Sequence, residues 1–212
     1  MPVESYEQRL KRWQASRFSP PPEVDLTPTQ PSSIAMAPMR DGIKLYTEIF
    51  MPPGAGPFPV VLHRSPYPMF RPSRHDFWPL SRYLDAGYIY VFQNTRGQHR
   101  SEGEFRMLLD DPDDGYDCIQ WIAEQPWCNG NVGMEGSSYA GSTQLFAARK
   151  KPPALKCIMP TAFIGNVTQF YPYQNGVPVK GFFLQWYKVA DTESMADLDC
   201  AYGDMSIIDD PV

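Results

Sequence analysis

Short apolar runs alternate with longer amphipathic stretches through the middle of this chain. The apolar runs have the length of β-strands and lie at residues 59–62, 88–92, 131–134 and 156–159. The stretches between them have helical length, end within two residues of a glycine or proline, and lie at residues 76–86, 113–125 and 139–150. Strands and helices that alternate in this way form right-handed crossovers and a mostly parallel sheet with helices on both faces. The pattern therefore predicts an α/β fold.

The segments before this alternation follow different patterns. Residues 34–39 and 43–50 are two short runs around Asp41-Gly42, which predicts a β-hairpin. Residues 1–33 contain a short amphipathic stretch followed by a proline-rich segment, so we expect an N-terminal arm or linker. Such an arm can lie on its own domain or on a partner subunit of a homo-oligomer.

The segment after the alternation is aromatic and irregular. Residues 34–164 carry the strand and helix pattern and are expected to form the α/β domain. Residues 165–212 lack that pattern, and they resemble the start of an inserted cap more than another unit of the sheet. We therefore expect an arm, part of an α/β domain and the start of a cap.

The composition is that of an ordinary globular protein, with 42% hydrophobic and 20% charged residues among 212. A formal net charge of −5 without a long run of one sign argues against a nucleic-acid or acidic-membrane partner. The cysteines at 118, 128, 157 and 200 fit no zinc template, so we expect separate thiols and neither metal nor other cofactor. No signal-peptide pattern and no apolar stretch near the ~20 residues that span a bilayer are found, which favours a cytoplasmic protein.

The most informative local pattern is a serine between a predicted strand and a predicted helix, in the sequence GMEGSSYAG (133–141). A serine on such a turn presents its hydroxyl at the carboxyl end of the sheet, where it can act as a nucleophile. The turn is crowded, so the residues two before and two after the serine must be small. Ser138 meets this condition with Gly136 and Ala140, whereas the same positions around Ser137 hold a glutamate and a tyrosine. The following helix offers backbone N–H groups to a developing oxyanion.

Two nucleotide-binding patterns overlap the same glycines, and neither is complete. Gly136 and Gly141 are spaced as in the phosphate-binding loop G-x4-G-K-[ST], but Ser142 replaces the lysine that supplies charge to the phosphates. The glycines at 130, 133 and 136 are spaced G-x2-G-x2-G rather than G-x-G-x-x-G. Nucleotide binding is therefore the weakest of the functional hypotheses.

Several motifs of the chain resemble those of one family of serine hydrolases. They are MRDGIKLYTEIFMP (39–52), RSPY (64–67), TRG (95–97) with SEG (101–103), and the run 114–148, which contains QPW, NGNVG and GSSYAG. Over about residues 34–165 the chain is similar to the cocaine esterase, α-amino acid ester hydrolase and X-Pro dipeptidyl-peptidase family of α/β-hydrolases. The resemblance implies an α/β-hydrolase core, a helical cap and a C-terminal jelly-roll domain.

The resemblance also implies roles for individual residues. Ser138 is the implied nucleophile, and the implied oxyanion hole combines the phenol of Tyr67 with the backbone N–H of Tyr139. Arg96 and Glu102 correspond to residues that frame a loop near the site, although a surface ion pair or a capping pair explains them equally well. The implied substrate is a small molecule with an ester or amide bond.

The chain departs from the family pattern in two loops. Family members read Asp-x-Arg-Gly where this chain has Asn94 in the first position, which leaves the shape of that loop open. Members that bind a free amine carry carboxylates near the start of the cap, whereas residues 165–169 contain none. This second departure favours an uncharged acyl group in the substrate.

The histidines are all on one side of the candidate nucleophile. In this fold the triad follows the chain order serine, then Asp or Glu, then histidine. His63, His75 and His99 all precede Ser138. We therefore expect a truncated N-terminal portion that ends inside the cap, lacks the catalytic Asp and His, and is inactive alone. The alternative is a non-catalytic α/β-hydrolase-like module that binds a ligand or partner.

Overall fold

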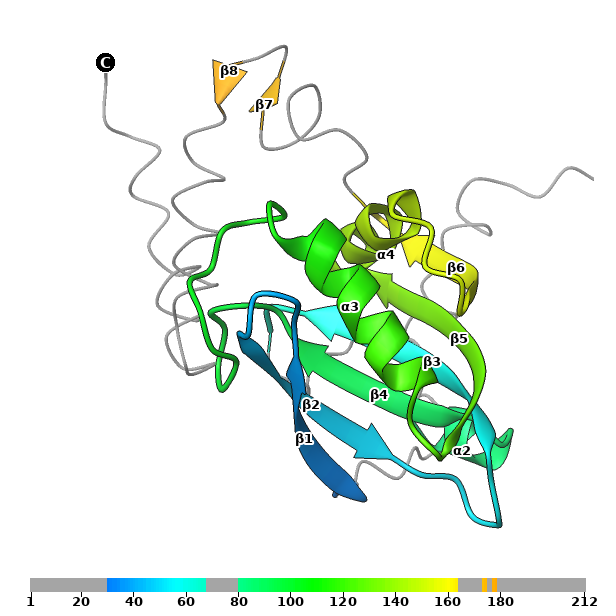
Figure 1. The fold of residues 1–212 in the computed structure, drawn as a ribbon. Helices are drawn as coiled ribbons and strands as arrows, with labels where there is room; N and C mark the ends of the chain where they lie inside the picture. Colours follow the sequence, from blue (N-terminus) through cyan, green and yellow to red (C-terminus); the bar gives the residue numbers. More distant parts are fainter. Residues whose placement is uncertain (1–29, 68–79, 164–172, 175–176, 179–212) are drawn as a thin grey trace, which may run out of the picture.

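The computed structural model describes residues 30–67, 80–163, 173–174 and 177–178 (Figure 1). Its strands are β1 (Ser33–Pro38), β2 (Lys44–Phe50), β3 (Phe58–Ser65), β4 (Ile89–Asn94), β5 (Cys128–Ser137), β6 (Leu155–Thr161), β7 (Tyr173–Gln174) and β8 (Val177–Pro178). The helices in the described residues are α2 (Leu80–Asp85), α3 (Asp111–Ala123) and α4 (Tyr139–Arg149). The predicted alternation of strands and helices from β3 to β6 is confirmed.

Six of the strands form one sheet, in the order β1-β2-β4-β3-β5-β6. β1 and β2 are antiparallel and meet at a turn where Gly42 N donates to Met39 O (2.9 Å), which confirms the predicted hairpin. β2 is antiparallel to β4, and the pairs β4–β3, β3–β5 and β5–β6 are parallel. The sheet is therefore mostly parallel, as the α/β pattern predicts. β7 and β8 pair in a separate two-stranded ribbon.

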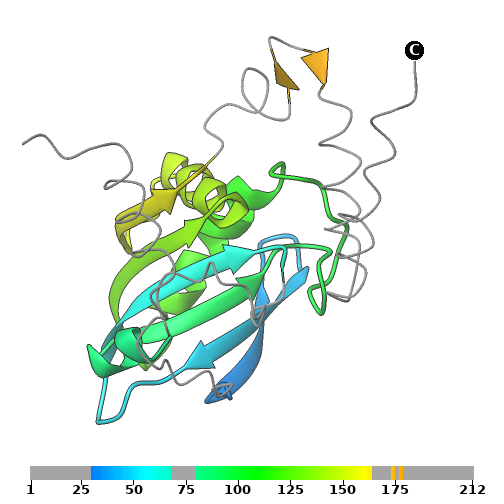
Figure 2. The same cartoon turned by 180° about the vertical axis from the view of Figure 1, so that it is seen from behind.

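Apolar side chains cover both faces of the sheet. On one face, Ile119 of α3 and Ala147 of α4 belong to the larger core, which also contains Leu62 of β3. On the other face, α2 packs on a smaller cluster that includes Tyr90 and Phe92 of β4. Figures 1 and 2 show α3 and α4 on one side of the sheet and α2 on the opposite side. The central strand β4 is buried throughout because helices cover it on both faces, as predicted.

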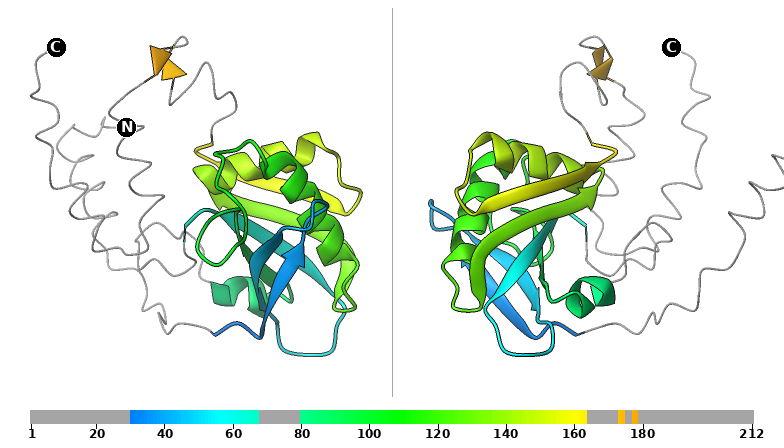
Figure 3. Two further views of the ribbon diagram at one scale, coloured as in Figure 1. Left: turned by 60° about the vertical axis from the view of Figure 1, so that its left-hand side comes forward. Right: turned by 90° about the vertical axis from the view of Figure 1, so that its right-hand side faces the viewer.

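The order of the strands reverses beside β3. The chain passes from β3 through α2 to β4 on one side, and then returns through α3 to β5 on the other side of β3. Ligands of open α/β sheets bind outside the carboxyl ends of the strands at such a switch point. Tyr67 follows β3 and Ser138 follows β5, so the fold places both predicted site residues at this edge. Figure 3 shows the twisted sheet, with β6 at its border next to β5.

Two strands are longer than the apolar runs that predict them. β3 continues to Ser65, and β5 runs from Cys128 to Ser137, well beyond residues 131–134. Each has a parallel partner on both sides, so inter-strand hydrogen bonds continue past the apolar residues. His63 therefore lies inside β3 instead of ending it.

His63 contacts the neighbouring strand β5 and packs on side chains of β4. Its Nδ1 lies 2.8 Å from Oε1 of Glu135 on β5, and the hydroxyl of Tyr90 donates to the same oxygen at 2.7 Å. The imidazole also stacks on Phe92, with 5.4 Å between ring centroids. Burial favours a raised pKa of Glu135, but the hydrogen bond and charge of His63, together with Tyr90, lower that pKa overall. Glu135 is thus kept ionised on the face that α2 covers.

The remaining sequence predictions are described only in part. The arm over residues 1–33 lies almost wholly outside the described residues, and so does the cap over residues 165–212 except for β7 and β8. In the described part of the chain, no helix is long and apolar enough to cross a membrane. Cys118, Cys128 and Cys157 are free thiols, as expected.

Gly115 marks a close approach of α3 to α4 and generates a prediction about stability. A Cβ added at this position would lie 2.7 Å from the Cβ of Ala147 and 3.2 Å from Nη1 of Arg64. Alanine is the better helix former by roughly 1 kcal/mol, but the overlap forces the two helices apart. We expect Gly115→Ala to lower the free energy of unfolding by about 1–3 kcal/mol, measured by urea denaturation of the intact protein.

The matched control is the double variant Gly115→Ala/Ala147→Gly, which removes the facing Cβ. It is expected to recover part of the lost stability. Equal unfolding free energies for the wild type and Gly115→Ala would contradict the close packing of α3 on α4.

The lowered pKa of Glu135 generates a prediction about pH. A carboxyl group with a lower pKa in the folded state binds its proton less readily there than in the unfolded chain. It therefore stabilises the fold above its ordinary pKa, and this stabilisation is lost as the pH falls through the lowered value. We expect the wild type to be more stable than Glu135→Gln by about 1–2 kcal/mol near neutral pH. The difference should shrink below the ordinary carboxyl pKa of roughly 4.3.

Thermal unfolding of both proteins, from neutral pH down to about pH 3, measures this difference. Glu104→Gln, at an exposed glutamate, serves as the control and should leave the unfolding temperature nearly unchanged across that range. A difference between wild type and Glu135→Gln that grows on acidification has the wrong sign for this account.

Candidate active site

Ser138 forms the turn between β5 and α4. Its backbone has φ 61° and ψ −119°, on the positive side of φ that residues other than glycine rarely adopt. Such a conformation costs about 1–3 kcal/mol and persists only where the surrounding structure imposes it. The Ser138 side chain is exposed and makes no capping hydrogen bond to α4 among the described residues. Its hydroxyl therefore lies open at the carboxyl edge of the sheet.

Small residues on either side make this conformation possible. Gly136 has φ 135°, and a Cβ added to it would lie 2.6 Å from the Cβ of Ala140. The same Cβ would lie 3.2 Å from Cε1 of His63, so the turn is crowded from two directions. Ser137, in contrast, is the last residue of β5 and pairs with Thr161 of β6. The crowding deduced from the sequence is thus present around Ser138.

Hydrogen bonds tie the turn to the sheet and to the helix. Ser138 N donates to Thr161 O at 2.9 Å, which continues the pairing of β5 with β6. Ser138 O accepts from the backbone N–H groups of Gly141 and Ser142, each at 3.1 Å, which starts the ladder of α4. Tyr139 is the first residue of α4, and the first N–H groups of a helix carry a partial positive charge without an intrahelical acceptor. The turn therefore places helix N–H groups beside the serine.

Tyr67 lies two residues beyond the end of β3, which is the strand that pairs with β5. Its side chain is half-buried, and its backbone N donates to the Ser65 hydroxyl at 3.1 Å. The Asn94 amide donates to the backbone carbonyls of Tyr67 (3.0 Å) and Ser65 (3.4 Å). An ionised aspartate has no hydrogen to donate to these carbonyls. Asn94, which replaces the aspartate of the family motif, therefore holds the segment that carries Tyr67 through hydrogen bonds that an aspartate could not donate.

A buried ion pair lies beneath the turn, on the face covered by α3 and α4. Arg64 of β3 is fully buried, and its Nη1 lies 3.1 Å from Oδ1 of Asp111 at the start of α3. The Tyr139 hydroxyl donates to Oδ2 of the same aspartate at 2.7 Å and accepts from Leu108 N at 3.0 Å. Burial raises the pKa of Asp111, although Arg64 and Tyr139 act in the opposite direction. Burial, followed by the charge of Asp111, raises the pKa of Tyr139 well above its usual value, so the phenol keeps its proton.

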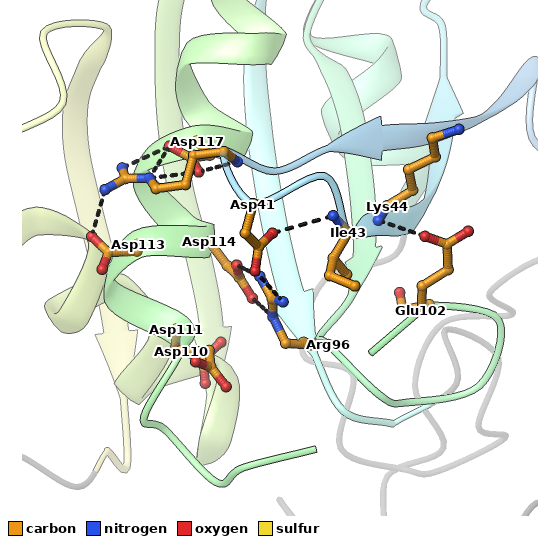
Figure 4. Close-up of polar contacts among 12 residues, drawn as sticks. Asp41, Ile43, Lys44, Arg96, Glu102, Asp110, Asp111, Asp113, Asp114 and Asp117 are labelled. Atoms are coloured by element: carbon orange, nitrogen blue, oxygen red, sulfur yellow. Dashed lines mark hydrogen bonds and ion pairs between the residues drawn. The ribbon is translucent and has the colours of Figure 1, made fainter. Parts of the chain in front are cut away.

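Arg96 ties the loop after β4 to α3 and to the hairpin turn. Figure 4 shows its guanidinium between Asp114 and Asp41. It donates to the two carboxylate oxygens of Asp114 at 3.1 and 2.6 Å and to Asp41 at 2.6 Å. These hydrogen bonds, that to Asp114 first, raise the pKa of Arg96 further. Glu102 accepts from Lys44 N at 2.9 Å, so both residues frame the loop, and Arg96 does so through a partly buried ion pair.

Arg64 and Asp111 are residues that sequence reasoning missed. Arg64 lies two residues beyond the apolar run at 59–62, and an arginine inside a strand that is covered on both faces needs a buried partner. Asp111 precedes the predicted start of the helix at residue 113, where acidic residues are explained by the helix dipole alone. The sequence thus indicated that Arg64 needs a buried partner, but it did not identify that partner.

The chain is similar in sequence to known proteins. Residues 41–204 match the family described as X-Pro dipeptidyl-peptidase (S15 family). The cocaine esterase of Rhodococcus sp. (strain MB1 Bresler) is 43% identical over 134 residues, which are 61% of this chain and 23% of the esterase. The Xaa-Pro dipeptidyl-peptidase of Lactobacillus helveticus (strain DPC 4571) is 26% identical over 135 residues, which are 53% of this chain and 17% of the peptidase.

Solved structures of similar proteins have the same fold. A CocE/NonD family hydrolase (SACOL2612) from Staphylococcus aureus has a TM-score of 0.66 and 28% sequence identity to this chain. The match covers 81% of this chain and 33% of the hydrolase. An α-amino acid ester hydrolase has a TM-score of 0.55 and 33% identity, and covers 69% of this chain and 29% of its own.

The chain spans about a quarter or less of the length of these curated relatives. The family match nevertheless covers well over half of the chain, and it includes the strand–serine–helix turn and the segment that carries Tyr67. The mostly parallel sheet with helices on both faces agrees with the structures of the relatives. The chain therefore belongs to the X-Pro dipeptidyl-peptidase (S15) family of α/β-hydrolases.

Proposed function

We propose that the chain is part of a serine hydrolase that cleaves carboxylic esters or amides through an acyl-enzyme on Ser138. The observation that carries this proposal is the backbone of Ser138, which is strained to φ 61° on a crowded strand–helix turn. Strained backbone of this kind clusters at active sites and ligand-binding sites. Here it exposes a hydroxyl at the edge of the sheet where ligands of this fold class bind.

In the proposed reaction, Ser138 Oγ attacks the acyl carbon of the substrate and loses its proton to a general base. The carbonyl oxygen becomes an oxyanion, which accepts hydrogen bonds from the Tyr67 phenol and the Tyr139 N–H. The bond from the acyl carbon to the leaving group then breaks, and the leaving alcohol or amine takes the proton from the base. Water, activated by the same base, attacks the acyl-enzyme and releases the acid and the serine.

The general base is proposed to come from residues outside this sequence. His63 is hydrogen-bonded to Glu135 on the face covered by α2, which argues against a role for it beside Ser138. No histidine follows Ser138 among the 212 residues, whereas the relatives have several times this length. The missing Asp and His are therefore assigned to the portion of the protein that corresponds to the rest of these relatives.

The substrate class is proposed from the relatives and from the charges of this chain. The relatives include esterases and a dipeptidyl-peptidase by name. Residues 165–169, which correspond to the carboxylate-bearing start of the cap in amine-binding members, contain no acidic residue. An acyl group without a free amine is therefore proposed. The arm over residues 1–33 remains a proposed contact to a second subunit.

Covalent labelling tests the nucleophile. We expect a fluorophosphonate probe to modify the intact protein at Ser138, because such probes form a bond to an activated serine and release fluoride. Ser138→Ala should abolish labelling, and the matched control Ser137→Ala should retain it. Peptide mapping by mass spectrometry identifies the modified residue. Labelling that persists in Ser138→Ala would contradict the assignment of Ser138 as nucleophile. An intact wild-type protein that is not labelled and does not hydrolyse an ester supports a non-catalytic binding module.

The phenol of Tyr67 gives a second prediction. Tyr67→Phe keeps the ring and removes one proposed donor to the oxyanion, so kcat for a p-nitrophenyl ester should fall by about 10²–10³-fold with KM nearly unchanged. Tyr88→Phe, at an exposed tyrosine before β4, is the control and should keep wild-type kinetics. A fall confined to KM would show that Tyr67 binds substrate and does not stabilise the oxyanion.

A further inference from the structure

One buried network joins the two segments of the chain that carry the proposed oxyanion donors. Asp111, at the start of α3, accepts from Arg64 with one carboxylate oxygen and from the Tyr139 phenol with the other. Arg64 belongs to β3, the strand that leads to Tyr67, and Tyr139 follows Ser138 directly. Figure 4 shows Asp111 at the first turn of α3. A single carboxylate therefore links the segments that carry the two proposed donors.

The Tyr139 side chain is held at both ends. Its hydroxyl donates to Asp111 at 2.7 Å and accepts from Leu108 N at 3.0 Å, and the residue is only 4% exposed. The ring of Phe105 packs beside it, with 6.1 Å between centroids. These contacts restrain the phenol, and through the side chain they restrain the Cα and the backbone N–H at its other end. An oxyanion hole requires a backbone N–H that keeps a fixed direction.

The Arg64 side chain is held as firmly. Its Nε donates to Oε1 of Gln93 at 2.8 Å, and its Nη1 contacts both the carboxylate and the backbone carbonyl of Asp111. The backbone carbonyl of Arg64 also accepts from the Thr143 hydroxyl of α4 at 3.3 Å. Within the described residues, Asp111 is the carboxylate paired with this buried cation. Breaking a buried pair by removing one partner leaves an uncompensated charge.

We propose that Asp111 is a positioning residue that holds the Tyr139 N–H and the β3 segment before Tyr67 in one geometry, so that both donors meet the same oxyanion. This inference rests on the proposed serine hydrolase function. Asp111 does not touch the substrate in this account and acts only through Tyr139 and Arg64. Loss of the phenol–carboxylate bond loosens the oxyanion hole while leaving the nucleophile in place.

The test compares variants by the rate and by the end point of fluorophosphonate labelling at Ser138 of the intact protein. Tyr139→Phe keeps the backbone N–H and the ring but loses the bond to Asp111. It should reach the same final labelled fraction as the wild type, with a second-order rate constant lowered by about 10-fold, less than the loss of a whole donor. Tyr116→Phe removes a phenol from α3 outside the network and is the matched control, expected at the wild-type rate.

Asp111→Asn provides the second variant, and the double variant separates positioning from simple loss of stability. If Asp111 acts through the Tyr139 phenol, Asp111→Asn should slow labelling less in the Tyr139→Phe background than in the wild-type background. A purely structural role lowers the final labelled fraction or the unfolding temperature but leaves the rate per labelled site unchanged.

The outcomes separate the two proposals. A labelled wild type with slowed Tyr139→Phe and non-additive variants supports the inference. A labelled wild type with an unchanged rate in Tyr139→Phe overturns the inference and leaves the serine hydrolase standing. Additive effects of Asp111→Asn and Tyr139→Phe also overturn it. Absence of labelling at Ser138 in the wild type overturns the serine hydrolase and this inference with it.

Discussion

The strained backbone of Ser138 is the constraint on which the rest of the proposed site depends. A positive φ at a serine is unfavourable, so the conformation requires the surrounding structure to impose it. That imposition comes from the pairing of β5 with β6 up to Thr161 and from the immediate start of α4. Gly136 and Ala140 supply the space in which the chain reverses. Any change that relaxes one of these elements also relaxes the position of the hydroxyl.

Charged groups brace the turn from both faces of the sheet. Glu135, three residues before Ser138, pairs with His63 and Tyr90 on the face covered by α2. Tyr139, one residue after Ser138, bonds to Asp111 on the face covered by α3 and α4. Buried charges are tolerated only when they are paired and hydrogen-bonded, because desolvation otherwise costs several kcal/mol. These contacts tie the residues on either side of the turn to both faces of the sheet.

Much of the fold follows from local patterns. Side-chain periodicity predicts the alternation of strands and helices and the hairpin around Asp41-Gly42. The small size of the neighbouring residues selects Ser138 over Ser137. Such features are encoded within a few residues of one another, so they can be read without knowing the topology. The strand ends could not be read in this way, because β3 and β5 continue past their apolar runs only through hydrogen bonds to strands distant in sequence.

The sequence by itself determined the α/β class, the family resemblance, and the serine and tyrosine positions around which the function is proposed. The tertiary structure alone decided which polar residues meet. It paired His63 with Glu135 across 72 residues, Arg64 with Asp111 across 47, and Asp111 with the Tyr139 phenol across 28. A local pattern identifies residues that need a partner, since a buried charge must be compensated. Only the order β4-β3-β5 of the sheet, and the helices packed on it, bring each partner within hydrogen-bond distance.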